Sequence, residues 1–468
     1  MQLAVETETR APRPASPEKS RDGFTTSLTR EHGYERLRVE GTIPEALRGT
    51  LVRNGPGLLE LFDKPYSHLF EGDGALLAVR FDDEGALGAH RVIQSEALLE
   101  ERRRGRPLYG SNAPSLRRAW NGLRMRIKNA ANTSVMHWQG RLLALFEAGL
   151  PTEVSLEDLS TVGATDLDGM IEFAFSAHPH RVASRETTFN FGQRVFPRAM
   201  LDIYELPDRG PARQLTSVPL KRPVMLHDFI ATDTHLVFFV SPARLSMFRA
   251  VFGIGDLASW FQWTPEDGTE VIAIPIDRPD EVVRFDAEPF WVWHFANAFD
   301  RGSEIVVDYV RYRDFASLAA LAKPGVPVEQ GRLCRVVLDL EKKTLGESVP
   351  HCDLPCEFPV VDPARAGAPI ETIWIASDDG GANIAKVDIA TGAVRRWALP
   401  EGHIPSEPIL VPGPGDDEGS VLVLAYDPGR HESYVAVLDA TRPETGPVAR
   451  LWLGHHTPPT FHGTFIPA

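Results

Sequence analysis

Short apolar runs alternate with polar turn signals along most of the chain. The segment 382–401, "ANIAKVDIATGAVRRWALPE", has one apolar-rich run, a polar turn at Thr391, and a second run. The segments 331–348 and 433–454 repeat this form, and 271–288 is a weaker copy. Two such runs joined by a turn predict a β-hairpin. The spacing of the copies by tens of residues is typical of propeller blades, so the pattern predicts an all-β fold.

Two segments, 115–133 and 241–263, predict helices instead. The second is unusually apolar for a surface helix, which leaves two interpretations. It forms a cap packed on the propeller face, or it is an exposed patch that docks on a membrane. Nine basic residues and no acidic residue lie between Arg102 and Lys128, which favours contact with anionic headgroups. We therefore expect possible peripheral membrane contact through 102–128 and 241–263.

Composition narrows the class of protein. The 468 residues are 43% hydrophobic and 24% charged, and no linker divides them, so we expect one domain over 23–468. The polar, Pro-containing segment 1–22 predicts a disordered tail without a signal peptide. A net charge of −15 argues against nucleic acid as a partner. Three cysteines and the lack of a long apolar run predict a soluble, cytoplasmic protein.

Four of the fifteen histidines lie in apolar surroundings that a surface histidine would not have. They are His178 in "FAFSAHPHRV", His227 in "VMLHDFIAT", His294 in "FWVWHFANAFD" and His462 in "PPTFHGTFIPA". The run "VMLHDFIAT" predicts a buried strand. A propeller brings its inner strands to one axis, so four such imidazoles would form a metal site. His180 lies two residues after His178, and spacing alone leaves both as ligands.

Three glutamates are set in apolar or Pro-rich segments: Glu147 in "LLALFEAGLP", Glu357 in "LPCEFPVVDP" and Glu407 in "IPSEPILVP". A glutamate is rarely buried unless it is paired. Metal-bound imidazoles usually donate their second N–H to a carboxylate, so these side chains are candidates to orient the histidines.

Together these segments resemble the carotenoid oxygenase family, also called carotenoid cleavage oxygenases. The likeness runs from "GTLVRNGPG" at Gly49 to the C-terminal "FHGTF", and it includes "NAANTSV", "MLHDFIAT", "HFANAFD" and "SEPILVPGPG" in the family's order. The resemblance implies a seven-bladed β-propeller with a helical cap over one face. It also implies a non-haem Fe(II) on the axis.

The family's ligand positions fall on four residues of this chain: His178, His227, His294 and His462. Its outer glutamates fall on Glu147, Glu357 and Glu407, which by analogy orient His227, His294 and His462 respectively. Thr133 matches a threonine beside the open iron position. Phe146 stands where lignostilbene-cleaving relatives carry a lysine, which counts against a phenolic stilbene.

The resemblance implies cleavage of a conjugated C=C bond by O2 to give two carbonyl products. Neutral imidazoles suit Fe(II), and four of them in an octahedral field leave positions for O2. An apolar polyene, a carotenoid or apocarotenoid, is the expected substrate. Five aromatic residues are candidates to line its tunnel: Phe146, Trp291, Trp293, Phe295 and Phe461. The alternatives are a stilbenoid dioxygenase, a retinoid-type isomerohydrolase, and a non-catalytic propeller that binds partners.

Overall fold

The computed structural model describes residues 23, 25–321, 330–415 and 418–468. The tail expected at 1–22 lies outside these residues. The four hairpins expected from the apolar pattern are confirmed as antiparallel pairs. They are β28 (Ala382–Asp388) with β29 (Val394–Ala398), β24 (Gly331–Asp339) with β25 (Thr344–Leu345), β33 (Glu432–Asp439) with β34 (Pro447–Trp452), and β20 (Thr269–Pro275) with β21 (Val283–Ala287).

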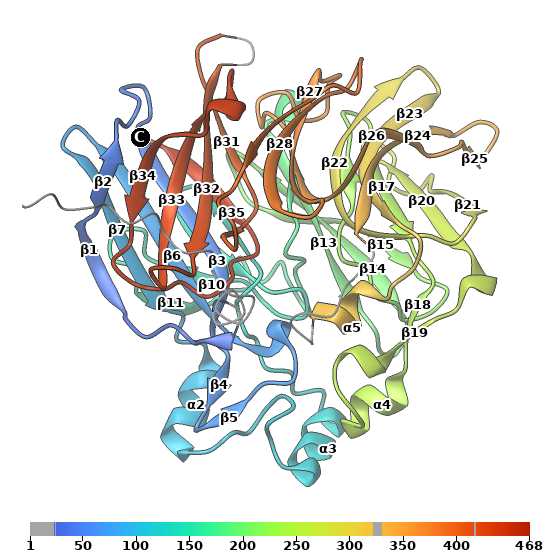
Figure 1. The fold of residues 1–468 in the computed structure, drawn as a ribbon. Coiled ribbons are helices and arrows are strands. Elements are labelled where there is room, and N and C mark those ends of the chain that lie inside the picture. The colour runs from blue at the N-terminus through green and yellow to red at the C-terminus, as the bar shows by residue number, and fades with distance from the viewer. Residues whose placement is uncertain (1–22, 24, 322–329, 416–417) are drawn as a thin grey trace, which may run out of the picture.

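The strands form seven blades arranged in a ring (Figure 1). The first blade holds β1 (His32–Arg36), β3 (Gly49–Leu58), β6 (Asp73–Asp82), β7 (Gly85–Val92) and β35 (Gly463–Pro467). The second holds β8 (Ser134–Trp138), β9 (Arg141–Leu145), β10 (Thr152–Val154) and β11 (Thr161–Ala164). The third holds β12 (His180–Val182), β13 (Thr187–Arg194), β14 (Met200–Pro207) and β15 (Arg213–Pro219). The fourth holds β16 (Ile230–Ala231), β17 (His235–Val240), β20 and β21.

The fifth and sixth blades share one continuous sheet. It contains β22 (Trp291–Arg301), β23 (Glu304–Tyr312), β24, β25, β26 (Val349–Val360), β27 (Thr372–Asp378), β28 and β29. The long strand β26 joins them, because one part of it pairs with β24 and the other part pairs with β27. The seventh blade holds β2 (Arg38–Gly41), β30 (Ile404–Pro405), β31 (Ile409–Pro412), β32 (Gly419–Asp427), β33 and β34.

Both ends of the described chain close the ring. The C-terminal strand β35 pairs with β3 in the first blade, and the second strand of the chain, β2, pairs with β34 in the seventh. Each end of the chain therefore crosses the seam between the last blade and the first. A propeller closed in this way leaves no long unpaired sheet edge at the seam.

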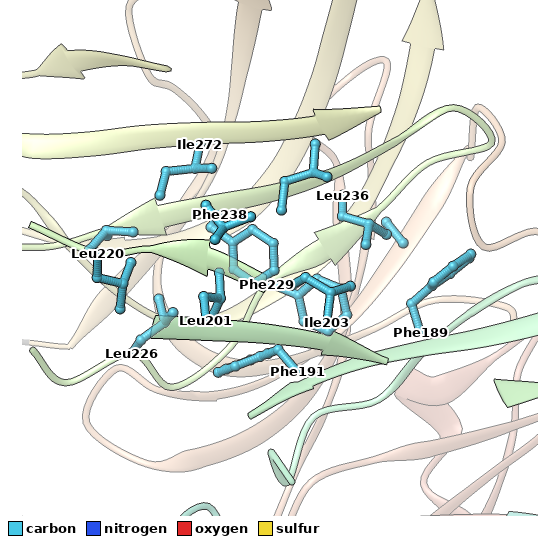
Figure 2. Close-up of a cluster of buried hydrophobic side chains, with 14 of the residues drawn as sticks. Phe189, Phe191, Leu201, Ile203, Leu220, Leu226, Phe229, Leu236, Phe238 and Ile272 are labelled. Atoms are coloured by element: carbon cyan, nitrogen blue, oxygen red, sulfur yellow. The ribbon is translucent and has the colours of Figure 1, made fainter. Parts of the chain in front are cut away.

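Apolar side chains fill the space between each blade and the next. Figure 2 shows the cluster between the third and fourth blades, which includes Phe191 and Phe238. Strand β17 contributes side chains to two such clusters, because alternate residues point to opposite faces of a sheet. Phe238 packs toward the third blade and Phe239 toward the fifth. This alternation explains the short apolar runs that the sequence pattern displays.

Helices and short hairpins cover one face of the ring, as expected from the resemblance (Figure 1). The cap contains α2 (Glu96–Arg104), α3 (Ser115–Leu123), α4 (Met247–Phe252), α5 (Ser317–Leu321) and the 3₁₀ turns η1 (Leu69–Glu71) and η3 (Ala258–Trp260). Two small hairpins join it: β4 (Glu60–Leu61) with β5 (Lys64–Pro65), and β18 (Ala243–Leu245) with β19 (Phe261–Trp263). Three more 3₁₀ turns lie elsewhere: η2 (Ala183–Arg185), η4 (Pro265–Asp267) and η5 (Pro443–Thr445).

The buried strand expected in "VMLHDFIAT" is wrong in its secondary structure, although its burial is confirmed. Only Ile230–Ala231 is a strand there, and 225–229 has no regular structure. Asp228 accounts for part of this. Its carboxylate accepts hydrogen bonds from the backbone N–H groups of Phe229 (2.8 Å) and Phe295 (2.9 Å). The side chain thereby takes the place of a strand partner, as aspartate does in local turns.

Candidate metal centre

The four histidines singled out in the sequence meet inside the ring. His178, His227 and His462 each lie a few residues before the innermost strand of a blade, namely β12, β16 and β35, and His294 lies within β22. Their ligand atoms all lie within 4.8 Å of one another, and no other such group occurs among the described residues. His180 points elsewhere, because its Nε2 pairs with Asp228 Oδ1 at 2.8 Å. The structure thus brings His178, and not His180, into the group.

Three of the four imidazoles contact a glutamate through Nδ1. His294 Nδ1 donates to Glu357 Oε2 at 2.5 Å. His462 Nδ1 donates to Glu407 Oε1 at 2.9 Å. The pairs match the three pairings that the resemblance implies, the third being the contact of His227 Nδ1 with Glu147 Oε1.

These contacts fix where the free lone pairs lie. Because Nδ1 of His294 and of His462 carries the hydrogen, Nε2 of each neutral ring is bare. The two Nε2 atoms are 3.2 Å apart. His178 Nε2 is buried and has no hydrogen-bond partner. An orphaned buried nitrogen is costly unless a cation or a donor fills the space, so these lone pairs fit a metal ion.

Burial and mutual proximity set the charge of these groups. Burial, reinforced by the neighbouring imidazoles, lowers the pKa of His178 well below its usual value. Burial also lowers the pKa of His462, although Glu407 opposes the shift. For Glu407, burial raises the pKa, but the charges of His462 and Arg53 outweigh it and the net pKa is lowered. For His294, burial lowers the pKa, but Glu357 outweighs it and the net pKa is raised. A metal ion takes the place of a proton on Nε2, so the centre offers imidazole nitrogens backed by carboxylates, which is a donor set that Fe(II) accepts.

All seven blades contribute a residue to the axis, from within or just before an inner strand. In blade order the residues are His462, Thr133, His178, His227, His294, Glu357 and Glu407. Contacts of β35 with β8 and β31, and of β16 with β12 and β22, place these strands side by side around the axis. Thr133 immediately precedes β8 and is buried, and its carbonyl accepts the backbone N–H of His462 at 3.2 Å.

An apolar cavity of about 360 Å³ opens next to the histidines. Its wall includes Thr133, His227, His294 and His462, together with the aromatic residues Phe70, Trp293, Phe358, Phe461, Tyr312 and Tyr426. Two of the five aromatic residues expected to line a tunnel, Trp293 and Phe461, are part of this wall.

The other three expected tunnel residues lie outside the described wall. Trp291 and Phe295 are buried between blades, on either side of the fifth. Phe146 follows β9 and forms a bridge with Phe175, so it packs against the third blade. The pairing of β22 shifts register between Val292 and Phe295 and again between Phe295 and Asn297, so simple alternation does not predict which of its residues reach the axis.

Two residues that support the glutamates were not identified from the sequence. Tyr312 donates its hydroxyl to Glu357 Oε1 at 2.7 Å. Arg53 donates to Glu407 Oε2 at 2.8 Å and also holds Thr460 Oγ1 and the carbonyl of Phe461. The sequence offered a signal for Arg53, because it lies within the apolar run "GTLVRNGPG" and a buried guanidinium needs a partner.

Comparison with known proteins agrees with this geometry. The family model described as "Retinal pigment epithelial membrane protein" matches residues 25–467. An apocarotenoid-15,15'-oxygenase of Synechocystis is 31% identical, with 94% of each chain covered. A carotenoid cleavage dioxygenase 8 homologue of rice is 30% identical over 95% of this chain and 87% of its own. The solved structure of a variant of the Synechocystis apocarotenoid oxygenase superposes with a TM-score of 0.89 at 29% identity, covering 97% of this chain and all of its own. A family match over nearly the whole length, on a propeller with the same arrangement, shows that the chain belongs to the carotenoid oxygenase family.

Proposed function

We propose that the protein is an Fe(II)-dependent dioxygenase that cleaves one conjugated C=C bond of a carotenoid or apocarotenoid. Each carbon of the cleaved bond receives one oxygen atom of O2, so the products are two carbonyl compounds. The observation that carries the proposal is a cluster of four imidazoles, three of which (His227, His294 and His462) lie at the wall of an apolar cavity. His178, His227, His294 and His462 would hold the ion, and when bound it supplies the coordination positions and electron density that O2 activation requires.

The residues of the chain have separate tasks in this scheme. The aromatic wall, including Phe70, Trp293 and Phe461, excludes water and holds a rigid polyene beside the histidines. Thr133 narrows the space next to His462. The glutamates keep the Nδ1 hydrogens of His227, His294 and His462 in place, so that the Nε2 lone pairs of these three rings are free for the ion. The centre contains no carboxylate ligand, and the cleavage requires no separate acid or base.

The test is anaerobic purification, iron quantification and incubation with a panel of apocarotenals under ¹⁸O2. Near-stoichiometric iron and labelled aldehyde from one polyene support the proposal. His178→Ala should lose iron and activity, whereas the matched variant His180→Ala should retain iron, because His180 pairs with Asp228 instead. Turnover of resveratrol-type phenols, or product without label, would contradict the proposal and favour the stilbenoid or isomerohydrolase alternative.

We further propose that the cap docks on a membrane surface from the cytoplasm. Leu116 is 89% exposed and Phe248 66% exposed, on α3 and α4 respectively. The two helices pack together, because Gly122 lies directly against the backbone of Val251 (Figure 1). The apolar patch consists of the exposed residues of and next to these helices: Leu116, Trp120, Leu123, Met125, Ile127, Phe248, Phe252 and Ile254. A cluster of exposed apolar side chains, unlike single scattered ones, is typical of an interaction site.

The charged residues around the patch favour a lipid bilayer as its binding partner. Arg117, Arg118, Arg124 and Arg126 lie between or beside its residues in the sequence, and anionic headgroups attract such charges. Lys128 does not belong to this basic group, because it is buried and pairs with Asp73 and Glu101 at 2.7 and 2.8 Å. Among the described residues, no helix has the length and apolar character that crossing a bilayer requires.

The patch also connects to the cavity. Helix α4 contacts η3, η3 contacts α5, and Ser317 and Leu321 of α5 are part of the cavity wall. A lipid-soluble substrate that enters through the cap would therefore reach the cavity along these contacting elements.

A further inference from the structure

Two connections cross the seam between the seventh and first blades in opposite directions. The turn after β1 leads from the first blade into β2 of the seventh. The segment 453–462 leads from β34 of the seventh blade back to β35 of the first. His32, in β1, and His455, in the returning segment, meet at this seam. Their ring centroids are 5.1 Å apart, and the two Nε2 atoms are 2.9 Å apart.

The hydrogen-bond partners of the two rings define their tautomers. His32 Nδ1 lies 2.9 Å from the carbonyl oxygen of Gly33. His455 Nδ1 lies 2.8 Å from the carbonyl oxygen of His456. A carbonyl oxygen only accepts, so both Nδ1 atoms carry the hydrogen and donate it. In neutral rings both Nε2 atoms are then bare, and two lone pairs face each other at 2.9 Å.

Lone pairs at this distance repel unless a cation lies between them. A shared proton would require a charged imidazolium in a buried place, since the side chain of His32 is 7% exposed and residue His455 is 8% exposed. Burial disfavours that charged form. A metal ion avoids this cost by keeping both imidazoles neutral. Two nitrogens at about 2.0–2.1 Å from one ion lie roughly 2.8–3.4 Å apart for angles between a right angle and the tetrahedral angle.

The axial centre of the same molecule also has facing Nε2 atoms and Nδ1 atoms that donate to oxygen. Its Nε2 atoms of His294 and His462 face each other at 3.2 Å, and both Nδ1 atoms donate to oxygen acceptors. Donation of the second ring N–H to a carbonyl or carboxylate is usual for metal-bound histidine. The seam pair thus has the geometry of half of a four-histidine centre.

We propose that His32 and His455 bind a divalent transition-metal ion, separate from the axial centre, that ties the two seam connections together. Imidazole suits Zn²⁺, Ni²⁺ and Cu²⁺, and Zn²⁺ is the simplest probe. His90 lies beside His455, with a ring-centroid distance of 5.4 Å, and its buried Nδ1 has no partner. His90 does not join them as a third ligand, because the axial histidines are the only group of three or more possible metal ligands among the described residues. Two protein ligands leave the other positions to water, so the ion should exchange readily.

The consequence is a gain in stability when the ion is present. An ion that binds the folded chain and not the unfolded one stabilises it by mass action. The seam is where the ring closes, so the ion would act on the contact between the ends of the chain. Arg30 and Glu35, which pair with each other at 2.7 Å, lie next to His32, and together they add no net charge.

The test uses the iron-loaded protein, so that the axial centre is occupied. Zinc is titrated calorimetrically at pH 7.5, with iron content measured before and after. We expect one equivalent of Zn²⁺ to bind without displacing iron and to raise the melting temperature. His32→Gln and His455→Gln should each weaken this binding at least tenfold and abolish the rise. His431→Gln is the matched control, because His431 stacks on the adjacent His456 but belongs to neither metal set.

The proposal is wrong if zinc binds only by displacing iron, or if both glutamine variants bind the extra equivalent as the unchanged protein does. It is also wrong if ¹⁵N shifts show a protonated His32–His455 pair at pH 7.5 and no zinc binds, since the cation would then be a proton. If one variant does not fold, the other carries the test, because both ligands are required. A zinc-edge anomalous difference peak between the two Nε2 atoms would locate the ion directly.

Discussion

The guanidinium of Arg53 lies 2.8 Å from the carboxylate of Glu407, and only 1% of Arg53 is exposed. Glu407 in turn holds His462, so a positive charge stands directly behind one imidazole of the metal centre. Of the three glutamates next to the histidines, Glu407 has an arginine as its counter-ion and Glu357 has the phenol of Tyr312.

Replacing Arg53 by Met should destabilise the protein and release the metal. Removing one partner of a buried ion pair costs about 3–5 kcal/mol, because the other charge stays buried without compensation. His462 would also lose the fixed carboxylate that orients it. Urea unfolding and iron quantification measure the two effects.

Arg335→Met is the matched control for this variant. Arg335 pairs with the buried carboxylate of Asp308 through two hydrogen bonds of 2.8 and 2.9 Å, away from the cavity wall. The Arg335→Met variant should lose stability but keep its iron. Equal iron loss in both variants would show that Arg53 acts only on the fold.

Weakening the support of His294 should lower metal affinity in two steps. Glu357→Gln removes the charge that accepts the His294 Nδ1 hydrogen, and changes of this kind cost about 10- to 100-fold in metal affinity or activity. Tyr312→Phe removes one hydrogen bond to the same carboxylate and should have a smaller effect in the same direction. Chelator competition with Fe(II) under anaerobic conditions gives both affinities. A larger loss for Tyr312→Phe than for Glu357→Gln would contradict this order.

Acidification should destabilise the protein through His456. Burial lowers the pKa of His456 from the usual 6.5 to about 4. Between these values the unfolded chain binds a proton that the folded chain does not, so the free energy of unfolding rises with pH and falls as pH drops from 6.5 toward 4. Urea unfolding of the metal-free protein at several pH values measures this slope. His456→Gln should reduce this slope by at most one proton's contribution, about 1.4 kcal/mol per pH unit, because other buried imidazoles such as His178 also contribute to it. An unchanged slope would contradict the assignment.

Membrane binding should depend on the exposed tips of α3 and α4. The double variant Leu116→Ser with Phe248→Ser removes two apolar side chains, each contributing up to about 1.5–3 kcal/mol when fully buried. We expect at least tenfold weaker binding to anionic vesicles, with unchanged iron content. Val349→Ser, at an exposed position of β26 outside the patch, is the control. Trp260 is a poorer probe, because its Nε1 donates to the Ile254 carbonyl within the cap.

The sequence predicted the parts of this protein that depend on local pattern or on family motifs. The hairpins were predictable because alternation and turn chemistry are local, and the propeller with its histidines came from motifs in the family's order. The strand expected around His227 was wrong because Asp228 takes backbone hydrogen bonds from a neighbouring blade. That partner is 67 residues away, so no local pattern predicts it.

Tertiary contacts also explain the other differences between the sequence-based expectations and the structure. Lys128 looked like part of a basic surface, but α2 and β6 bring acidic residues around it. Trp293 reaches the cavity while Trp291, two residues earlier, is buried between blades. Arg53 and Tyr312 gain their roles only through partners that lie 354 and 45 residues away.

The order in which the blades supply the axial residues has a consequence for biosynthesis. His178, His227 and His294 come from three consecutive blades, but the fourth imidazole, His462, follows two further blades along the chain. A ribosome that has completed the fifth blade has therefore produced a three-histidine pocket without its last ligand. If the four histidines hold the ion as proposed, the complete ligand set exists only after β35 has closed the ring, so tight metal binding would follow ring closure during folding.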